Sequence, residues 1–114
     1  MSELKSDKDL MLFVLEQVEE LEQYLNGIEE YYFYNNNMLK DACFTKLLVI
    51  GEYSKRISNL VKEKHREIKW ERIAKARNFY AHGYGMADWT QIWETLKNEI
   101  PHLKQGFENI LTGL

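Results

Sequence analysis

The segment RNFYAHGYG, residues 77–85, gathers residue types that can act on a phosphodiester. A histidine that titrates near neutrality can move a proton to or from a ribose oxygen, which contributes roughly 10²–10⁴ in rate. An arginine can hold a phosphate and stabilise the charge that develops on it. Arg77 and His82 are therefore the best candidate pair in this segment. Asn78 can donate a further hydrogen bond, and Tyr84 can stack on a base or donate its hydroxyl.

The spacing of this pair leaves two interpretations open. Arg77 and His82 are five positions apart, which is about 140° around a continuous helix, so their side chains would diverge. A helix that ends near Gly83 could instead bring the imidazole back toward the guanidinium. The same residues would also suit a helix-end network in which the arginine pairs with an acid and the histidine caps carbonyl groups.

Charge is distributed unevenly along the chain. Residues 1–34 carry nine acidic side chains and two lysines, whereas residues 55–77 carry nine Lys or Arg side chains and three Glu. A basic segment of this kind indicates contact with a polyanion. The alternative is that its cations solvate a helix face and a connecting loop. Because the basic segment leads directly into Arg77, the two features together favour the polyanion.

Other signatures of enzymes or cofactor sites are missing from the sequence. It has no phosphate-binding glycine loop, metal-spaced histidine pair or nucleophile elbow. His65 and His102 stand alone and are predicted to be solvated surface residues. Cys43, the single cysteine, lies in an apolar run and is interpreted as a buried, unreactive thiol. We expect no cofactor and no bound metal, so any catalysis must come from few groups.

Apolar spacing predicts the helices that would position these groups. Steps of three and four residues indicate one helix from Asp7 to about Glu30, with Asp7 or Asp9 as its cap. The segment YYFYNNN then interrupts the helical pattern, because asparagines favour turns. A second helix is predicted from about Met38 to about Val61. The inner faces would consist of Leu10, Val14, Val18, Leu21, Leu25 and Ile28, and of Leu39, Ala42, Cys43, Lys46 or Leu47, Ile50, Tyr53, Ile57 and Leu60.

Two further helices follow. A shorter one is predicted over 70–80 and is ended by Gly83 and Gly85. The last one begins at the capping sequence DWTQ. Pro101 lacks a backbone donor and is predicted to kink or break this last helix at Ile100. The inner faces would consist of Trp70, Ile73 and Ala74, and of Trp89, Ile92, Trp93, Leu96, Ile100, Leu103, Phe107 and Ile110.

Four to five helices with short connections predict an all-α antiparallel bundle. A chain of 114 residues corresponds to a single domain, residues 1–114. The N-terminal sequence lacks the basic start and following apolar run that are typical of a signal peptide. No apolar stretch reaches the roughly 20 residues that a membrane span needs. We therefore expect a cytoplasmic protein without a membrane contact.

The order Arg, Asn, three residues, His, one residue, Tyr in RNFYAHGY resembles the motif of ribonucleases of the HEPN superfamily. Three more segments in matching order resemble the HepT-like toxins of HEPN–MNT toxin–antitoxin pairs. These segments are DACFTKLLVIGEYSKRIS, IKWERIAKARN and ADWTQIWETLKNEIPHLKQ. Arg-x4-His alone is a weak pattern, but four ordered segments over nearly the whole chain are specific. Two positions depart from the family: Lys69 stands where proline is frequent, and Tyr53 where alanine is common.

The resemblance implies an all-helical protomer that forms a homodimer, with the motifs of both subunits meeting in one cleft. It implies an endoribonuclease that cleaves RNA without a metal, by attack of the ribose 2′-hydroxyl on the adjacent phosphate. Carried over residue by residue, Arg77 and His82 form the catalytic pair, Asn78 is a supporting group and Tyr84 is the third motif position. It further implies a minimal nucleotidyltransferase (MNT) antitoxin that adds AMP to Tyr84, which would block RNA by charge and bulk.

Glu52 fits this scheme in one of two ways. A carboxylate that follows LLVIG lies at the edge of an apolar face, where an unpaired charge is unfavourable. It would pair with Arg77 or orient His82, or it would form a structural ion pair with another basic residue. The sequence leaves both interpretations of Glu52 open.

Two functions of other classes also stay open at this level. The same fold could serve as a non-catalytic HEPN-like module that binds a nucleotide or docks a nucleotidyltransferase. It could also be a purely structural helical dimer. Cleavage of RNA that depends on His82 would distinguish the enzyme from both alternatives.

Overall fold

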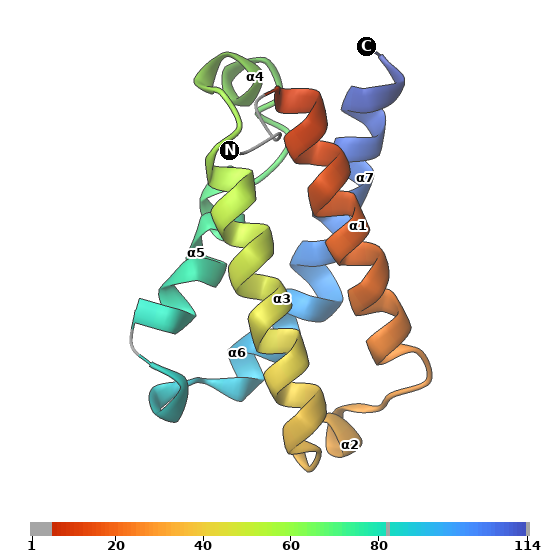
Figure 1. Ribbon diagram of the computed structural model, residues 1–114, viewed down its shortest axis with the longest axis vertical. Helices are drawn as coiled ribbons and strands as arrows, with labels where there is room; N and C mark the ends of the chain where they lie inside the picture. Colours follow the sequence, from red (N-terminus) through yellow and green to blue (C-terminus); the bar gives the residue numbers. More distant parts are fainter. Residues whose placement is uncertain (1–5, 82, 114) are drawn as a thin grey trace.

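The computed structural model describes residues 6–81 and 83–113, with the side chains of all of these except 76–81. Every regular element in these ranges is helical, which confirms the predicted all-α class (Figure 1). The elements are α1 (Asp7–Leu25), α2 (Glu30–Tyr34), α3 (Asn37–Lys55), α4 (Asn59–Lys64), α5 (Trp70–Ala81), the 3₁₀ turn η1 (Tyr84–Met86), α6 (Trp89–Glu94), the π-helical turn η2 (Thr95–Glu99) and α7 (Ile100–Thr112).

The helix α3 lies at the centre of the arrangement. It packs against α1 on one side and α5 on the other, and α1 also packs against α7. The long helices α1, α3 and α5 run in alternating directions, as in an antiparallel bundle (Figure 1). None of the described helices combines the length and apolar character needed to cross a membrane. The largest fully buried side chains belong to Met11, Val14, Val18, Leu21, Phe33, Leu47, Ile50, Ile68, Ile92, Leu103 and Phe107.

The first helix differs from its prediction at both ends. Ser6 is the cap, in place of Asp7 or Asp9, because its hydroxyl accepts the backbone N–H of Asp9 at 3.0 Å. The helix ends at Leu25, earlier than predicted. Gly27 follows with φ of 73°, a left-handed conformation through which a right-handed helix does not continue.

The segment YYFYNNN contains a short helix as well as the predicted interruption. Its aromatic half forms α2, which is anchored by the fully buried Phe33. The Phe33 ring lies 5.0 Å from that of Trp93 and 6.0 Å from that of Trp89, measured between ring centroids. Asn36 then caps α3 by accepting the backbone N–H of Leu39 at 3.0 Å. The asparagines therefore separate two helices, as their turn preference predicts.

The predicted single helix from Met38 to Val61 is in fact two helices, and this part of the prediction is wrong. The first, α3, ends at Lys55, and Ser58 caps the second, α4. Asp7 of α1 accepts hydrogen bonds from the Ser58 N–H at 2.8 Å and from its hydroxyl at 2.7 Å. This contact holds the chain in a non-helical conformation between the two helices. As a result Leu60, predicted to face the core, is 67% exposed.

Residues 89–112 form one unbroken helical run in which η2 joins α6 to α7. The predicted cap is confirmed, because the Asp88 carboxylate accepts the backbone N–H of Gln91 at 3.1 Å. The run has no break at Ile100. Instead, the hydrogen-bonding pattern changes to the π form just before Pro101, which lies in the first turn of α7. A first-turn position tolerates proline because its missing N–H needs no partner there.

Candidate functional site

Helix α5 carries the first part of the RNFYAHGYG motif, and its bounds match the prediction within one residue. Its start is fixed by Trp70, whose indole N–H donates to the His65 carbonyl at 3.0 Å and whose ring lies 5.7 Å from that of Phe107 in α7. The Ile73 side chain is buried and belongs to the core. Because α5 packs against α3 along this face, the main chain of Arg77 is held beside the bundle centre.

The side chains of Arg77 and Asn78, and all of His82, lie outside the described residues. Their roles therefore stay predictions. The described residues on either side of them belong to α5 and, after Gly83 with its φ of 79°, to η1.

Tyr84 is the motif residue whose surroundings are described in full. Its side chain is 44% exposed. Its ring meets those of Phe44 and Trp89 edge to face, with centroids 5.4 Å and 5.3 Å away. A hydrogen bond to the Asp41 carboxylate raises the pKa of the Tyr84 phenol, and burial and the charge of Asp41 add to this effect. Tyr84 is thus an accessible phenol whose ring is packed against two other aromatic rings.

A shallow hollow of about 300 Å³ opens beside this hydroxyl and is lined by Asp41, Phe44, Thr45 and Tyr84. The three α3 residues are spaced by three and four positions and therefore share one helix face. The neighbouring Lys40 places its ammonium 4.8 Å from the centre of the Trp89 ring. No sequence motif assigned a role to Asp41, although its helical spacing to Phe44 places both residues on the same face of α3.

Glu52 has Arg56 as one of its partners, at 4.0 Å between carboxylate and guanidinium. Both side chains are about half exposed, so the pair contributes little to stability. The Arg56 guanidinium also lies 4.5 Å from the centre of the Tyr53 ring. This geometry agrees with a structural ion pair for Glu52. The alternative contacts to Arg77 and His82 lie outside the described residues.

A second hollow, of about 420 Å³, flanks α5 on the side of the last helical run. It is lined by Arg72, Lys75, Gln91, Glu94, Thr95 and Glu99. Arg72 and Lys75 belong to the basic segment before the motif. The Arg72 guanidinium is 3.3 Å from the Glu99 carboxylate, so part of the positive charge is compensated. Lys75 supplies a further cation within one helical turn of Arg77.

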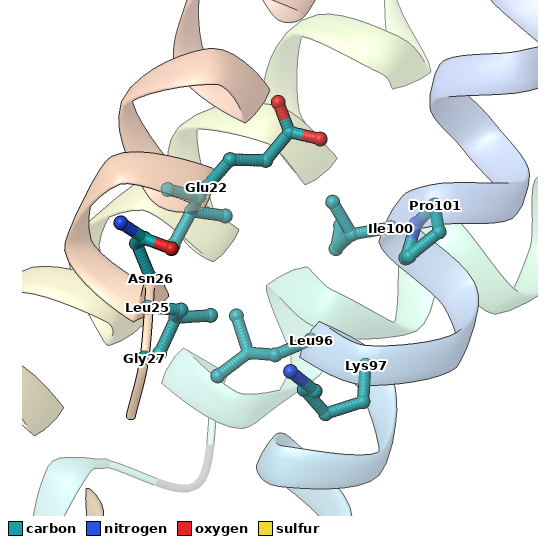
Figure 2. Close-up of a pocket in the computed structure, with 9 residues that line it drawn as sticks. Glu22, Leu25, Asn26, Gly27, Leu96, Lys97, Ile100 and Pro101 are labelled. Carbon is teal, nitrogen blue, oxygen red and sulfur yellow. The ribbon is translucent and has the colours of Figure 1, made fainter. Parts of the chain in front are cut away.

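A third hollow, of about 330 Å³, lies between the end of α1 and the start of α7 and is shown in Figure 2. Leu25 and Leu96 point toward one another across it (Figure 2). Its Glu22 carboxylate is already bound by Lys104 at 2.9 Å, and its Lys97 ammonium lies 5.2 Å from the centre of the Trp93 ring. These groups are engaged in contacts of the fold, so this hollow is a weaker candidate for chemistry than the one at Tyr84.

The cysteine and the two histidines outside the motif are engaged in or enclosed by the fold. Cys43 is fully buried, which confirms the predicted burial of this thiol, and burial raises its pKa to about 12. His65 contacts the Glu67 carboxylate at 3.2 Å. His102 is half-buried, and its Nε2 is enclosed without a hydrogen-bond partner among the described residues, so the prediction of a solvated side chain is wrong there. No cluster of three or more His, Cys, Asp or Glu that could hold a metal occurs within the described ranges.

Comparison with known proteins places the chain in a family. A family model described as "Ribonuclease HepT-like" matches residues 14–110. The protein "Putative RNase MJ1216" of Methanocaldococcus jannaschii is 34% identical over 107 residues, which cover 94% of this chain and 88% of that protein. The "Probable ribonuclease HepT" of Thermococcus cleftensis is 34% identical over 106 residues, covering 93% and 96%. No solved structure matches the chain. This chain therefore belongs to the ribonuclease HepT-like family.

Proposed function

We propose that this chain is a metal-independent endoribonuclease toxin whose Arg77 and His82 cleave RNA at the cleft of a homodimer. The observation that carries the proposal is the position of the motif. The family match over 14–110 includes all of RNFYAHGYG, and the basic segment runs directly into it. A ribonuclease family and a cationic approach to an Arg/His pair both fit RNA as the substrate.

The chemistry needs few groups. The 2′-hydroxyl attacks the adjacent phosphorus, the bond to the 5′-oxygen breaks, and a 2′,3′-cyclic phosphate remains. His82 moves the proton that leaves the 2′-hydroxyl or the proton that joins the departing oxygen. Arg77 binds the phosphate and stabilises the charge of the transition state. Asn78 adds a hydrogen bond, and two copies of His82 in a dimeric cleft would allow one to act as base and the other as acid.

The described surroundings support this arrangement from both sides of the motif. Before it, Lys75 lines a hollow on the flank of α5 and can attract the phosphate backbone, whereas Arg72 in the same hollow is paired with Glu99. After it, the accessible Tyr84 ring offers a stacking surface for a base. Packing of Ile73 in the core keeps α5 against α3, so the motif is attached to a rigid element.

Tyr84 also suits the proposed control by an MNT antitoxin. The phenolic oxygen would attack the α-phosphorus of a nucleoside triphosphate, pyrophosphate would leave, and the phenolic proton would be released. The product lacks the hydroxyl that donates to Asp41 and places a phosphate charge beside that carboxylate. The modified side chain would therefore be repelled from its present position, and its bulk and charge would hinder RNA.

The decisive test is cleavage of RNA by the purified chain in EDTA. We expect products that end in a 2′,3′-cyclic phosphate, and we expect His82→Ala and Arg77→Ala to lose cleavage while their circular dichroism stays that of the wild type. His65→Ala is the matched control, because it removes a histidine that contacts Glu67 instead. Equal cleavage by His82→Ala would contradict the mechanism. RNA binding without any product would favour a non-catalytic module.

Control by modification needs a separate experiment. A minimal nucleotidyltransferase is incubated with this chain and ATP, and the modified residue is identified by mass spectrometry. We expect AMP on Tyr84 and loss of RNA cleavage, with Tyr84→Phe unmodified. AMP on Tyr31 or Tyr32, which are more exposed than Tyr84, would contradict the assignment.

A further inference from the structure

The hollow beside Tyr84 combines two features that bind a nucleobase. Tyr84 is 44% exposed, and its aromatic ring packs against those of Phe44 and Trp89 in edge-to-face contacts. Such a ring can stack on an unpaired base, which is the usual way in which proteins bind single-stranded RNA. Asp41 lines the same hollow as Tyr84, so its carboxylate can meet the edge of a base that lies over the ring.

The carboxylate also determines which base fits. An ionised carboxylate only accepts hydrogen bonds and has sites for about four of them, so its bond from the Tyr84 hydroxyl leaves it free to accept more. Guanine presents two adjacent donors, N1–H and the 2-amino group, on its Watson–Crick edge. Adenine and cytosine place an acceptor next to their amino group, and uracil places carbonyl groups on both sides of its N3–H. Only guanine therefore offers two donors side by side to Asp41.

The charges around the hollow are compatible with RNA. Asp41 lies next to Lys40, whose ammonium is 4.8 Å from the centre of the Trp89 ring, at the same edge of the bundle. This cation offsets part of the repulsion between the carboxylate and a phosphate. The volume of about 300 Å³ admits one base in an open, solvent-facing position. Tyr84 is two residues from His82 in the sequence, so the hollow and the proposed catalytic pair belong to the same motif.

We propose that the hollow lined by Asp41, Phe44, Thr45 and Tyr84 is a guanine-binding subsite, with Tyr84 stacking on the base and Asp41 accepting from its N1–H and 2-amino group. This inference rests on the proposed ribonuclease function for its biological meaning, but the binding itself does not require cleavage. It assigns to Asp41 the selection of the base beside the scissile phosphate.

Binding of free nucleotides tests the subsite directly. The full chain is titrated with the 5′-monophosphates of guanosine, adenosine, cytidine and uridine, and the NMR signals of Thr45 and Tyr84 are followed. We expect guanosine monophosphate to bind roughly tenfold more tightly than the others, the discrimination typical of a bidentate contact. Equal affinity for all four nucleotides, or shifts elsewhere without shifts at Thr45 and Tyr84, would overturn the proposal.

Two matched variants distinguish a specific contact of the Asp41 carboxylate from the general effect of removing one negative charge. Asp41→Asn keeps the shape and an acceptor for the Tyr84 hydroxyl, but its amide cannot accept both donors of guanine, so the preference is lost. Asp88→Asn removes an equal charge from the cap of α6, where asparagine also caps well, and keeps the preference. Preserved guanine preference in Asp41→Asn with unchanged circular dichroism would overturn the proposal.

Cut-site mapping links the subsite to the enzyme. In an RNA with all sixteen dinucleotide steps, we expect cleavage by the wild type to cluster beside guanine and by Asp41→Asn to spread over other bases. RNA cleavage without base preference, together with equal affinities for the four nucleotides, would support the ribonuclease function and refute the guanine subsite. Selective binding of guanosine monophosphate without RNA cleavage would support the guanine subsite and refute the ribonuclease function.

Discussion

Ile73 offers the sharpest test of how the fold supports the motif. Its side chain is 3% exposed and anchors α5 to the core, directly before the motif. Shortening it to valine should lower the free energy of unfolding by about 0.5–1.5 kcal/mol, and to alanine by about 2–5 kcal/mol. Lys75→Ala, on the exposed face of the same helix, should change it by less than about 0.5 kcal/mol.

Urea unfolding followed by circular dichroism measures these differences. With a denaturant slope of about 1–3 kcal/mol per molar urea, a loss of 3 kcal/mol lowers the unfolding midpoint by about 1–3 M. The slope itself should stay unchanged, because the variants remove volume and not secondary structure. An unfolding midpoint for Ile73→Ala equal to that of Lys75→Ala would refute the anchoring role of Ile73.

The same variants connect packing to activity. A native chain with about 5–15 kcal/mol of stability keeps most molecules folded after the loss of Ile73. Because Ile73 lies one turn before Arg77, we expect α5 to open locally more often, and RNA cleavage by Ile73→Ala to fall more than the folded fraction does. Cleavage that follows the folded fraction alone would show that the motif does not depend on this anchor.

Four further outcomes follow from buried or paired side chains. Cys43 should react with a thiol reagent at neutral pH at least about a thousandfold more slowly in the folded chain than in urea, because burial raises its pKa from 9.0 to about 12. Between these two pH values only the unfolded chain releases the thiol proton. The free energy of unfolding of the wild type, relative to that of Cys43→Ala, should therefore fall as pH rises from 9.0 to about 12. The pKa of the Tyr84 phenol should move down toward its ordinary value in Asp41→Asn, because a neutral amide replaces the charged hydrogen-bond acceptor, as read from tyrosine carbon NMR shifts during a pH titration. Phe107→Ala removes a fully buried ring and should lower the unfolding free energy by about 3–5 kcal/mol, measured by urea unfolding, whereas a change below 1 kcal/mol would contradict its place in the core.

The surroundings of Tyr84 unite the two proposals made for this chain. An accessible phenol can meet a nucleotidyltransferase, and the same ring can hold a base of the substrate. Modification at this oxygen would then disrupt the subsite that selects guanine, so control and specificity would act at one position. Asp41→Asn would separate these roles, because it changes base selection but leaves the phenol available.

Local patterns in the sequence were sufficient to predict several elements. The helix 70–81 and the cap at Asp88 depend on contacts between residues three or four positions apart, which spacing reveals. The buried stripe of the last helical run, from Ile92 to Ile110, follows from the same periodicity. The all-α class and the family motif were also readable, because both are written in residue order.

Contacts between distant residues decided the rest. The end of α3 and the start of α4 depend on the hydrogen bond from Ser58 to Asp7, 51 positions away in the sequence, so helical periodicity alone extended the helix too far. Likewise, Asp41 and Tyr84 lie on different elements, and only packing of η1 beside α3 joins a carboxylate, three aromatic rings and a hollow into one place. The sequence by itself determined which groups could act on RNA. The tertiary structure decided which neighbours Tyr84 has, because side-chain contact depends on how helices pack and not on their order along the chain.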